Sequence, residues 1–249
     1  MLKMNYKKTT SVAVSLTLAM QVILPAVSLA QTSDNGGLFC SKMTTVFSQI
    51  DQRMATRQAK LVQFNSQRQS TIASNESRVD AQLAQKRTNW SADRAKQYAA
   101  LEAKTKTEQQ KQAVATFKTA MEAAIATRQA GVNTAVSTFR TGLDQNIATR
   151  NTAIKSAITA FNNSTSAAQS KAEADCSAKV RPLTIAKTYR ASMMAARNEY
   201  ANALRAIEKI NVRGLVETRR VAVKKAVDDF QTSAQQARAT LKVAFGESQ

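Results

Sequence analysis

Residues 114–161 read VATFKTAMEAAIATRQAGVNTAVSTFRTGLDQNIATRNTAIKSAITAF. Apolar side chains recur in this stretch at intervals of three, four and four residues, with Arg at two of the matching positions. The stripe consists of Val114, Phe117, Met121, Ile125, Arg128, Val132, Val136, Phe139, Leu143, Ile147, Arg150, Ile154, Ile158 and Phe161. Eleven residues in three turns correspond to about 3.67 residues per turn. A sheet cannot produce this period, so the stretch predicts a long helix in a nearly straight or weakly right-handed coiled coil.

A compatible stripe precedes it. Its members are Ile50, Met54, Arg57, Leu61, Phe64, Arg68, Ile72, Val79, Leu83, Trp90 and Leu101, with Tyr98 beside them. Between the two stripes, Lys104 to Gln112 contains no apolar residue. We therefore predict a helix–helix turn near 104–112 and an antiparallel hairpin over residues 38–180. The Arg residues within the stripes fit this arrangement, because their long stems can cover the seam while the guanidinium groups reach water. The alternative interpretation is a row of cations that binds an anionic partner.

The two cysteines provide an independent test of the hairpin. Folding the chain about residue 107 or 108 places Phe117 opposite Tyr98 and brings Cys40 and Cys176 together at the open end. In an oxidising compartment an isolated pair of this kind forms one disulfide. Two Cys without any His cannot complete a zinc shell, so we predict a disulfide rather than a metal site.

The C-terminal region, residues 181–249, has helical stripes of its own. Pro182 suits the first turn of a helix, which we expect to run to about Ile210. Asn-Val-Arg-Gly at 211–214 predicts a turn, and a last helix is expected to reach about Phe245. A short basic hairpin folded about this turn would pair Met193 with Phe230. The expected fold is all-α, with this short hairpin packed against the disulfide-bearing end of the long one as a four-helix base.

The N-terminus has the pattern of a secretory signal. Lys3, Lys7 and Lys8 precede an apolar run from 12 to 29, and small residues end it at Ala30. We predict that residues 1–30 are a cleaved signal peptide and that 31–37 form a flexible N-terminus. The alternative is an uncleaved membrane anchor. No other segment is apolar enough to span a bilayer, so no stable transmembrane span is expected after cleavage.

Charge is the strongest indication of a partner. The chain has 36 Lys and Arg against 17 Asp and Glu, and a net charge of +19. Such a protein attracts polyanions or anionic membranes, unless the charge serves only to keep it soluble. The region 181–225 is especially basic. The candidate polyanion-binding residues there are Arg213, Arg219, Arg220, Lys224 and Lys225, and the secondary candidates at the hairpin tip are Lys104, Lys106 and Lys111. A solvated basic face is the alternative interpretation of both groups.

The residues needed for catalysis are missing from the sequence. The chain contains no His as a general base or metal ligand and no glycine-rich phosphate loop. Its carboxylates are scattered along expected helices rather than paired for acid–base work. We therefore expect a protein that is not an enzyme, with no cofactor, no metal and no small-molecule substrate.

Three functions fit these features. The first is an exported structural or interaction protein of the cell envelope or exterior that contacts anionic polymers or other helical proteins, and that can self-associate through its coiled coil. The second is a holdase, since the chain is similar to Skp-type chaperones in charge, export and helical hairpins, although it has no strand segment for their trimerising barrel. The third is a lipid-surface protein, since the 11- and 22-residue periods resemble those of apolipoproteins and desiccation-protective helical proteins.

Overall fold

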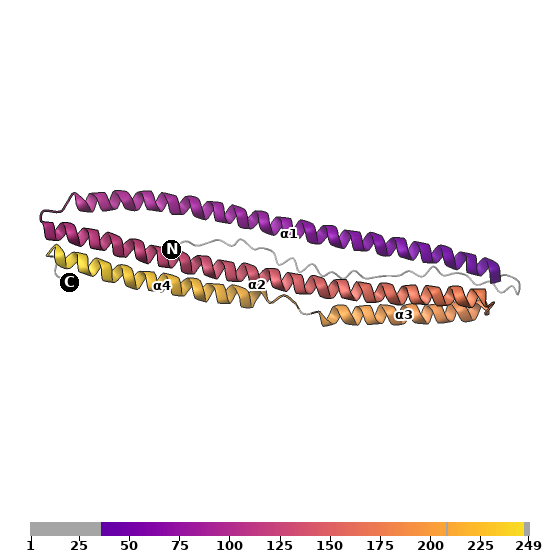
Figure 1. Ribbon diagram of the computed structural model, residues 1–249. Helices are drawn as coiled ribbons and strands as arrows, with labels where there is room; N and C mark the ends of the chain where they lie inside the picture. Colours follow the sequence, from indigo (N-terminus) through magenta and orange to yellow (C-terminus); the bar gives the residue numbers. More distant parts are fainter. Residues whose placement is uncertain (1–35, 208, 247–249) are drawn as a thin grey trace. The chain divides into compact units, whose positions relative to one another are not determined.

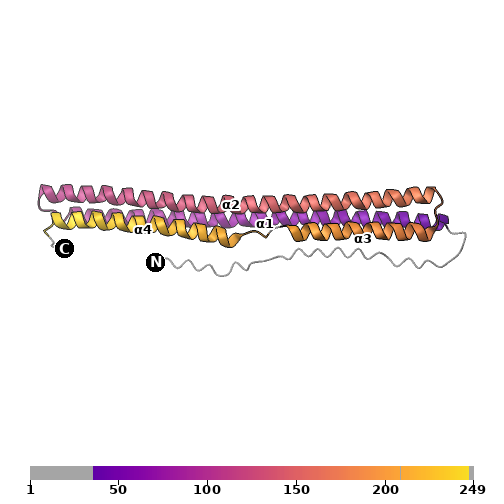
Figure 2. The same cartoon turned by 90° about the horizontal axis from the view of Figure 1, so that it is seen from below.

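A computed structural model describes residues 36–207 and 209–246 (Figures 1 and 2). This part of the chain forms four helices and no strand: α1 (Gly36–Glu102), α2 (Glu108–Ser177), α3 (Pro182–Ala206) and α4 (Val212–Ala244). The all-α fold is therefore confirmed. The predicted signal peptide and residues 31–35 lie outside the described residues. None of the described helices is long and apolar enough to cross a membrane.

The described helices contribute to two compact units. Unit 1 contains α1 up to Thr56, α2 from Ile158 onward, and α3 up to Asn202. Unit 2 contains α1 from Arg57, α2 up to Ala157, the end of α3 and the whole of α4. Each unit therefore has three long helical segments packed together, rather than the four of the expected base.

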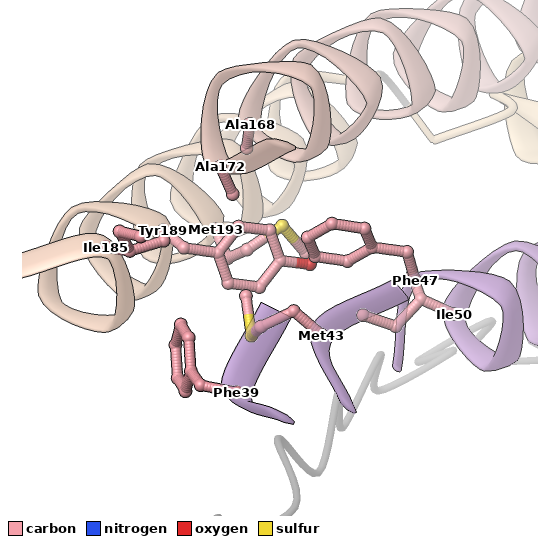
Figure 3. Packing of buried hydrophobic residues seen from close by; sticks show 9 residues of the cluster. All are labelled: Phe39, Met43, Phe47, Ile50, Ala168, Ala172, Ile185, Tyr189 and Met193. Carbon is pink, nitrogen blue, oxygen red and sulfur yellow. The ribbon is translucent and has the colours of Figure 1, made fainter. Parts of the chain in front are cut away.

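Unit 1 is closed by the predicted disulfide. Cys40 on α1 and Cys176 on α2 are bonded, with their Cα atoms 6.0 Å apart. Beside the disulfide lies a cluster of nine buried side chains from all three helical segments (Figure 3). The cluster consists of Phe39, Met43, Phe47, Ile50, Ala168, Ala172, Ile185, Tyr189 and Met193. The rings of Phe47 and Tyr189 are 5.1 Å apart, so α1 and α3 meet directly in this core.

Unit 2 contains the predicted turn between the long helices, at residues 103–107. The rings of Tyr98 and Phe117 lie 6.3 Å apart, so this predicted pair is in contact. The hydroxyl of Tyr98 donates to Glu122 at 3.1 Å, and Arg94 pairs with the same carboxylate. Farther along, Arg140 on α2 donates two hydrogen bonds to Asp80 on α1, at 2.8 and 2.9 Å. The antiparallel pairing of α1 and α2 thus combines an apolar seam with charged contacts across it.

The stripe of α2 is its packed face. All fourteen of its residues, from Val114 to Phe161, are buried or half-buried. The stripe of α1 is less well covered, since Phe64, Arg68, Val79 and Trp90 are exposed. The burial of the α2 stripe agrees with the 3-4-4 pattern, while the right-handed supercoil remains a prediction.

The structure corrects the predicted C-terminal hairpin. Met193 on α3 is buried in the core of unit 1, whereas Phe230 on α4 packs in unit 2 against the cluster that includes Tyr98 and Met121. The predicted pairing of Met193 with Phe230 is therefore wrong. Residues 211–214 also have a different role, because Asn211 caps α4 by accepting a hydrogen bond from the backbone N–H of Gly214 at 2.9 Å.

Helix α4 packs antiparallel to α2, and contacts between the two helices recur after eleven residues. Arg128 lies over the ring of Phe230, and Arg219 lies over the ring of Phe139, so a step of eleven along α2 matches a step of eleven back along α4. Two glycines of α2 are also eleven residues apart and face α4. A Cβ at Gly131 would lie 2.9 Å from the Cβ of Ala226, and one at Gly142 would lie 2.8 Å from a methyl group of Leu215.

These two contacts predict opposite effects of the same substitution. Gly131→Ala is expected to lower the free energy of unfolding, because neither Cβ can rotate away and overpacking costs about 1–3 kcal/mol. Gly142→Ala is expected to raise it by up to about 1 kcal/mol, because the Leu215 methyl can move and Ala favours the helix. Urea denaturation of the two variants tests the contrast, and Ala226→Gly should restore the stability of Gly131→Ala. Equal gains from both glycine variants would contradict the close approach at Gly131.

The core of unit 1 contains a phenol without a hydrogen-bond partner. The hydroxyl of Tyr189 is buried and unpaired among the described residues. Burial, assisted by the charge of Asp51, raises the pKa of Tyr189 to about 12. Below pH 10 the phenol is protonated in the folded and unfolded states alike. Above it the unfolded phenol ionises first, so the free energy of unfolding should fall as pH rises from about 10 to 12.

Tyr189→Phe is the control for this pH dependence. The variant should lose that part of the alkaline destabilisation and should be no less stable at neutral pH, since it removes an unpaired hydroxyl. Thermal melts of both proteins at stepped pH measure the difference. Identical pH profiles would show that Tyr189 does not titrate abnormally.

Candidate functional site

The five primary candidates for polyanion binding all lie in the first part of α4, in unit 2. Three of them form ion pairs within the helix, because each has a carboxylate three or four residues away. Arg220 pairs with Glu217 at 2.7 Å, Lys225 pairs with Asp229 at 2.7 Å, and Lys224 pairs with Asp228. The hydrogen bond from Arg220 also holds the pKa of Glu217 below its usual range. The positive field of these three side chains is therefore locally compensated.

The other two primary candidates differ from each other. Arg219 is half-buried, and its guanidinium lies 4.5 Å from the centroid of the Phe139 ring, so it contributes to the packing of α4 on α2. Arg213 is exposed and forms no ion pair with any residue that the structure describes. The five predicted residues thus lie on one helix, but four of their five charged groups are already engaged in ion pairs or in packing on an aromatic ring.

The secondary candidates surround the turn between α1 and α2. Lys111 lies 3.5 Å from Glu108, and the neighbouring Lys118 lies 3.5 Å from Glu102. Lys104 and Lys106 are exposed, and within the described ranges neither forms an ion pair. Two carboxylates therefore stand among the cations of the tip, which weakens its attraction for an anion.

A different cationic surface lies on α3 in unit 1. Leu183, Lys187, Arg190, Met194 and Arg197 follow one another at steps of four, three, four and three residues, which places them on one side of the helix. All five are exposed. They lie on a different side of α3 from its buried residues, which are Ile185, Tyr189, Met193, Ala196 and Tyr200. We call these five exposed residues the α3 outer face.

No carboxylate accompanies the three cations of this face. The sequence from 182 to 198 contains no Asp or Glu. Glu199 follows Arg197 by two residues and therefore lies on another side of the helix. Lys187, Arg190 and Arg197 form no ion pair among residues 36–207 and 209–246. Their charges are compensated only by solvent and salt, so the α3 outer face projects a stronger field than the start of α4.

The cations of α3 belong to the same basic run, 181–225, but the five primary candidates were placed near the predicted second turn. Anion binding by these five residues stays a prediction. A useful signal in the sequence is the residue three or four places away in either direction. It is acidic for Arg220, Lys224 and Lys225, and it is not acidic for Lys187, Arg190 and Arg197.

The described residues contain no cluster of three or more His, Cys, Asp or Glu side chains that could hold a metal ion. A surface groove of about 370 Å³ between α2 and α4 is lined mainly by Thr and Ala side chains, with Lys225 and Asp229 at its edge.

No protein-family model, no curated protein and no solved structure matches this chain. The interpretation of its surface therefore depends on its own residues.

Proposed function

We propose that this chain is an exported, non-catalytic helical scaffold of the cell envelope or exterior, and that its α3 outer face contacts an anionic partner. The observation that carries the proposal is the exposure of Lys187, Arg190 and Arg197 on one side of α3 without an acidic neighbour. Cations arranged in this way attract phosphate, sulfate or carboxylate groups of any polyanion.

Export is supported by two features. Residues 1–30 have the sequence of a signal peptide, although they lie outside the described residues. The disulfide between Cys40 and Cys176 is typical of an oxidising compartment. The non-catalytic role is supported by the absence of His from the whole sequence and of any phosphate-binding loop.

A holdase is the second candidate, and exposed apolar side chains on α1 favour it. Val62, Phe64, Val79 and Trp90 are all exposed in unit 2. Such side chains can contact an unfolded client, or another helical protein including a second copy of this chain. Suppression of the aggregation of an unfolded client at a stoichiometric ratio would favour the holdase.

The anion-binding proposal predicts a site-specific loss of affinity. Replacing Lys187, Arg190 and Arg197 by Gln should weaken binding to duplex DNA, used as a generic polyanion, and should flatten its dependence on salt. If each cation meets one phosphate, the slope of log affinity against log salt should fall by roughly 3. Fluorescence anisotropy across a salt series measures both quantities.

The matched control removes the same charge from α4. Arg213→Gln, Arg220→Gln and Lys224→Gln also lower the net charge by three, but two of these side chains are already paired with carboxylates. This control should retain most of the affinity. An equal loss in both triple variants would mean that only net charge matters, and no binding by the unaltered protein at low salt would refute an anion-binding role.

A further inference from the structure

We propose that the anionic partner of the α3 outer face is a lipid surface, with the cations on lipid phosphates and with Leu183 and Met194 inserted among the headgroups. The inference rests on the proposed anion-binding function, and it adds the class of partner. The observation behind it is that the face is not purely cationic. Leu183 is 72% exposed and Met194 is 58% exposed, and both stand in line with the cations.

The order of residues along the face matches a bilayer surface better than a polymer. Leu183 and Met194 stand among Lys187, Arg190 and Arg197 on one side of the helix, so apolar and cationic groups can meet the same surface. A dissolved polyanion offers charge to the cations but nothing to the apolar side chains. The interface of an anionic bilayer offers both, since phosphates lie directly above the acyl chains.

Two further cations precede the helix. Lys179 and Arg181 in the turn between α2 and α3 are exposed and form no ion pair among the described residues of unit 1. Pro182 begins the helix directly after them. The α3 outer face from Leu183 to Arg197 extends over about 20 Å, from the 1.5 Å rise per residue.

The face is presented by a helix that is already folded. The buried side of this helix is fixed in the core of unit 1 through Ile185, Tyr189 and Met193. Binding therefore requires no folding of α3, and the helical content should not change when vesicles are added. This distinguishes the proposed mode from that of amphipathic segments that become helical only on the membrane.

A second copy of the same face is an unsuitable occupant. Two α3 outer faces would oppose Lys187, Arg190 and Arg197 to one another with no carboxylate between them, which is repulsive. The complementary surface must be anionic and must accept apolar groups. A phospholipid bilayer with anionic headgroups has both properties.

The test compares vesicle binding with DNA binding in the same set of proteins. The disulfide-bonded chain from residue 31 onward is sedimented with vesicles of phosphatidylcholine alone or with 30% phosphatidylglycerol. We expect binding only to the anionic vesicles, and no change in circular dichroism on binding. Leu183→Gln with Met194→Gln should weaken vesicle binding by about tenfold, since two apolar side chains no longer enter the interface, and should leave DNA binding unchanged.

Two further proteins complete the comparison. The triple Gln variant of Lys187, Arg190 and Arg197 should lose affinity for vesicles and for DNA, by about fivefold for each cation at the lipid surface. Val62→Gln with Val243→Gln removes two other exposed apolar side chains and should bind vesicles as the unaltered protein does. Thermal melts verify that every variant is folded.

The outcomes separate the two proposals. Unaltered vesicle binding by the Leu183/Met194 variant, or binding of the unaltered protein to DNA but not to anionic vesicles, would overturn the lipid inference and leave the anion-binding function standing. Binding to neither would overturn both. An equal loss in the Val62/Val243 variant would show that general surface hydrophobicity, rather than the α3 outer face, governs vesicle binding.

Discussion

Replacing both cysteines by Ser is expected to cause a large loss of stability. The disulfide joins residues separated by 136 positions in the sequence. Closing a loop of this length removes much of the entropy of the unfolded chain, and the loop-entropy relation gives about 5 kcal/mol. Measured effects commonly reach 2–5 kcal/mol. We therefore expect Cys40→Ser with Cys176→Ser to shift the urea midpoint strongly towards lower concentration.

Reduction provides the control for the cysteine variant. A thiol reductant should lower the stability of the unaltered protein to the same level and should have no effect on the double Ser variant. Intact mass without reductant should give a monomer with no free thiol. An unchanged urea midpoint in the variant, or a cysteine-linked dimer of the unaltered protein, would contradict a disulfide within one chain.

The long hairpin was predictable because its signals are local and mutually consistent. An eleven-residue period from Val114 to Phe161 specifies one packed side of a helix, and a matching period upstream specifies its partner. The polar stretch between them positions the turn, and the two cysteines then test the register. Extending the same period backwards from Ile50 and Met54 by eleven residues reaches Phe39 and Met43, which are buried in the structure and were missed in the sequence.

The partners of the last two helices were not predictable in the same way. The stripe of α3 identifies which side is buried but carries no information on the surface that buries it. The apolar side of α3 fits the core formed by α1 and α2 in unit 1, and that of α4 fits α1 and α2 in unit 2. Asn211 and Gly214 added to the error, because Asn favours both turns and helix N-caps.

The candidate site shows the same distinction between composition and arrangement. A run of Lys and Arg can be counted in the sequence, and the primary candidates were placed within this run at the start of α4. Whether a cation is available to a partner depends on its neighbours in the helix. The packing role of Arg219 could not be predicted from the sequence, because its contact with Phe139 depends on the position of α4 against α2.

The second large effect on the free energy of unfolding is expected at Ile185, which fixes α3 in the core of unit 1. This side chain is 1% exposed and packs in the core shared by α1, α2 and α3. Ile185→Ala removes buried methyl and methylene groups and leaves a cavity, and such changes cost about 2–5 kcal/mol. Urea denaturation followed by circular dichroism measures the loss in the free energy of unfolding.

Leu183→Ala is the matched control, two residues away on the same helix but on the outer face. Because Leu183 is exposed, its truncation should change the free energy of unfolding by no more than about 0.5 kcal/mol. The two variants should also differ in DNA binding, since Ile185→Ala disturbs the support of the cations while Leu183→Ala leaves their positions intact. A small effect at Ile185 would mean that α3 is not fixed to unit 1, and the cations would then lack the rigid arrangement on which the proposed site depends.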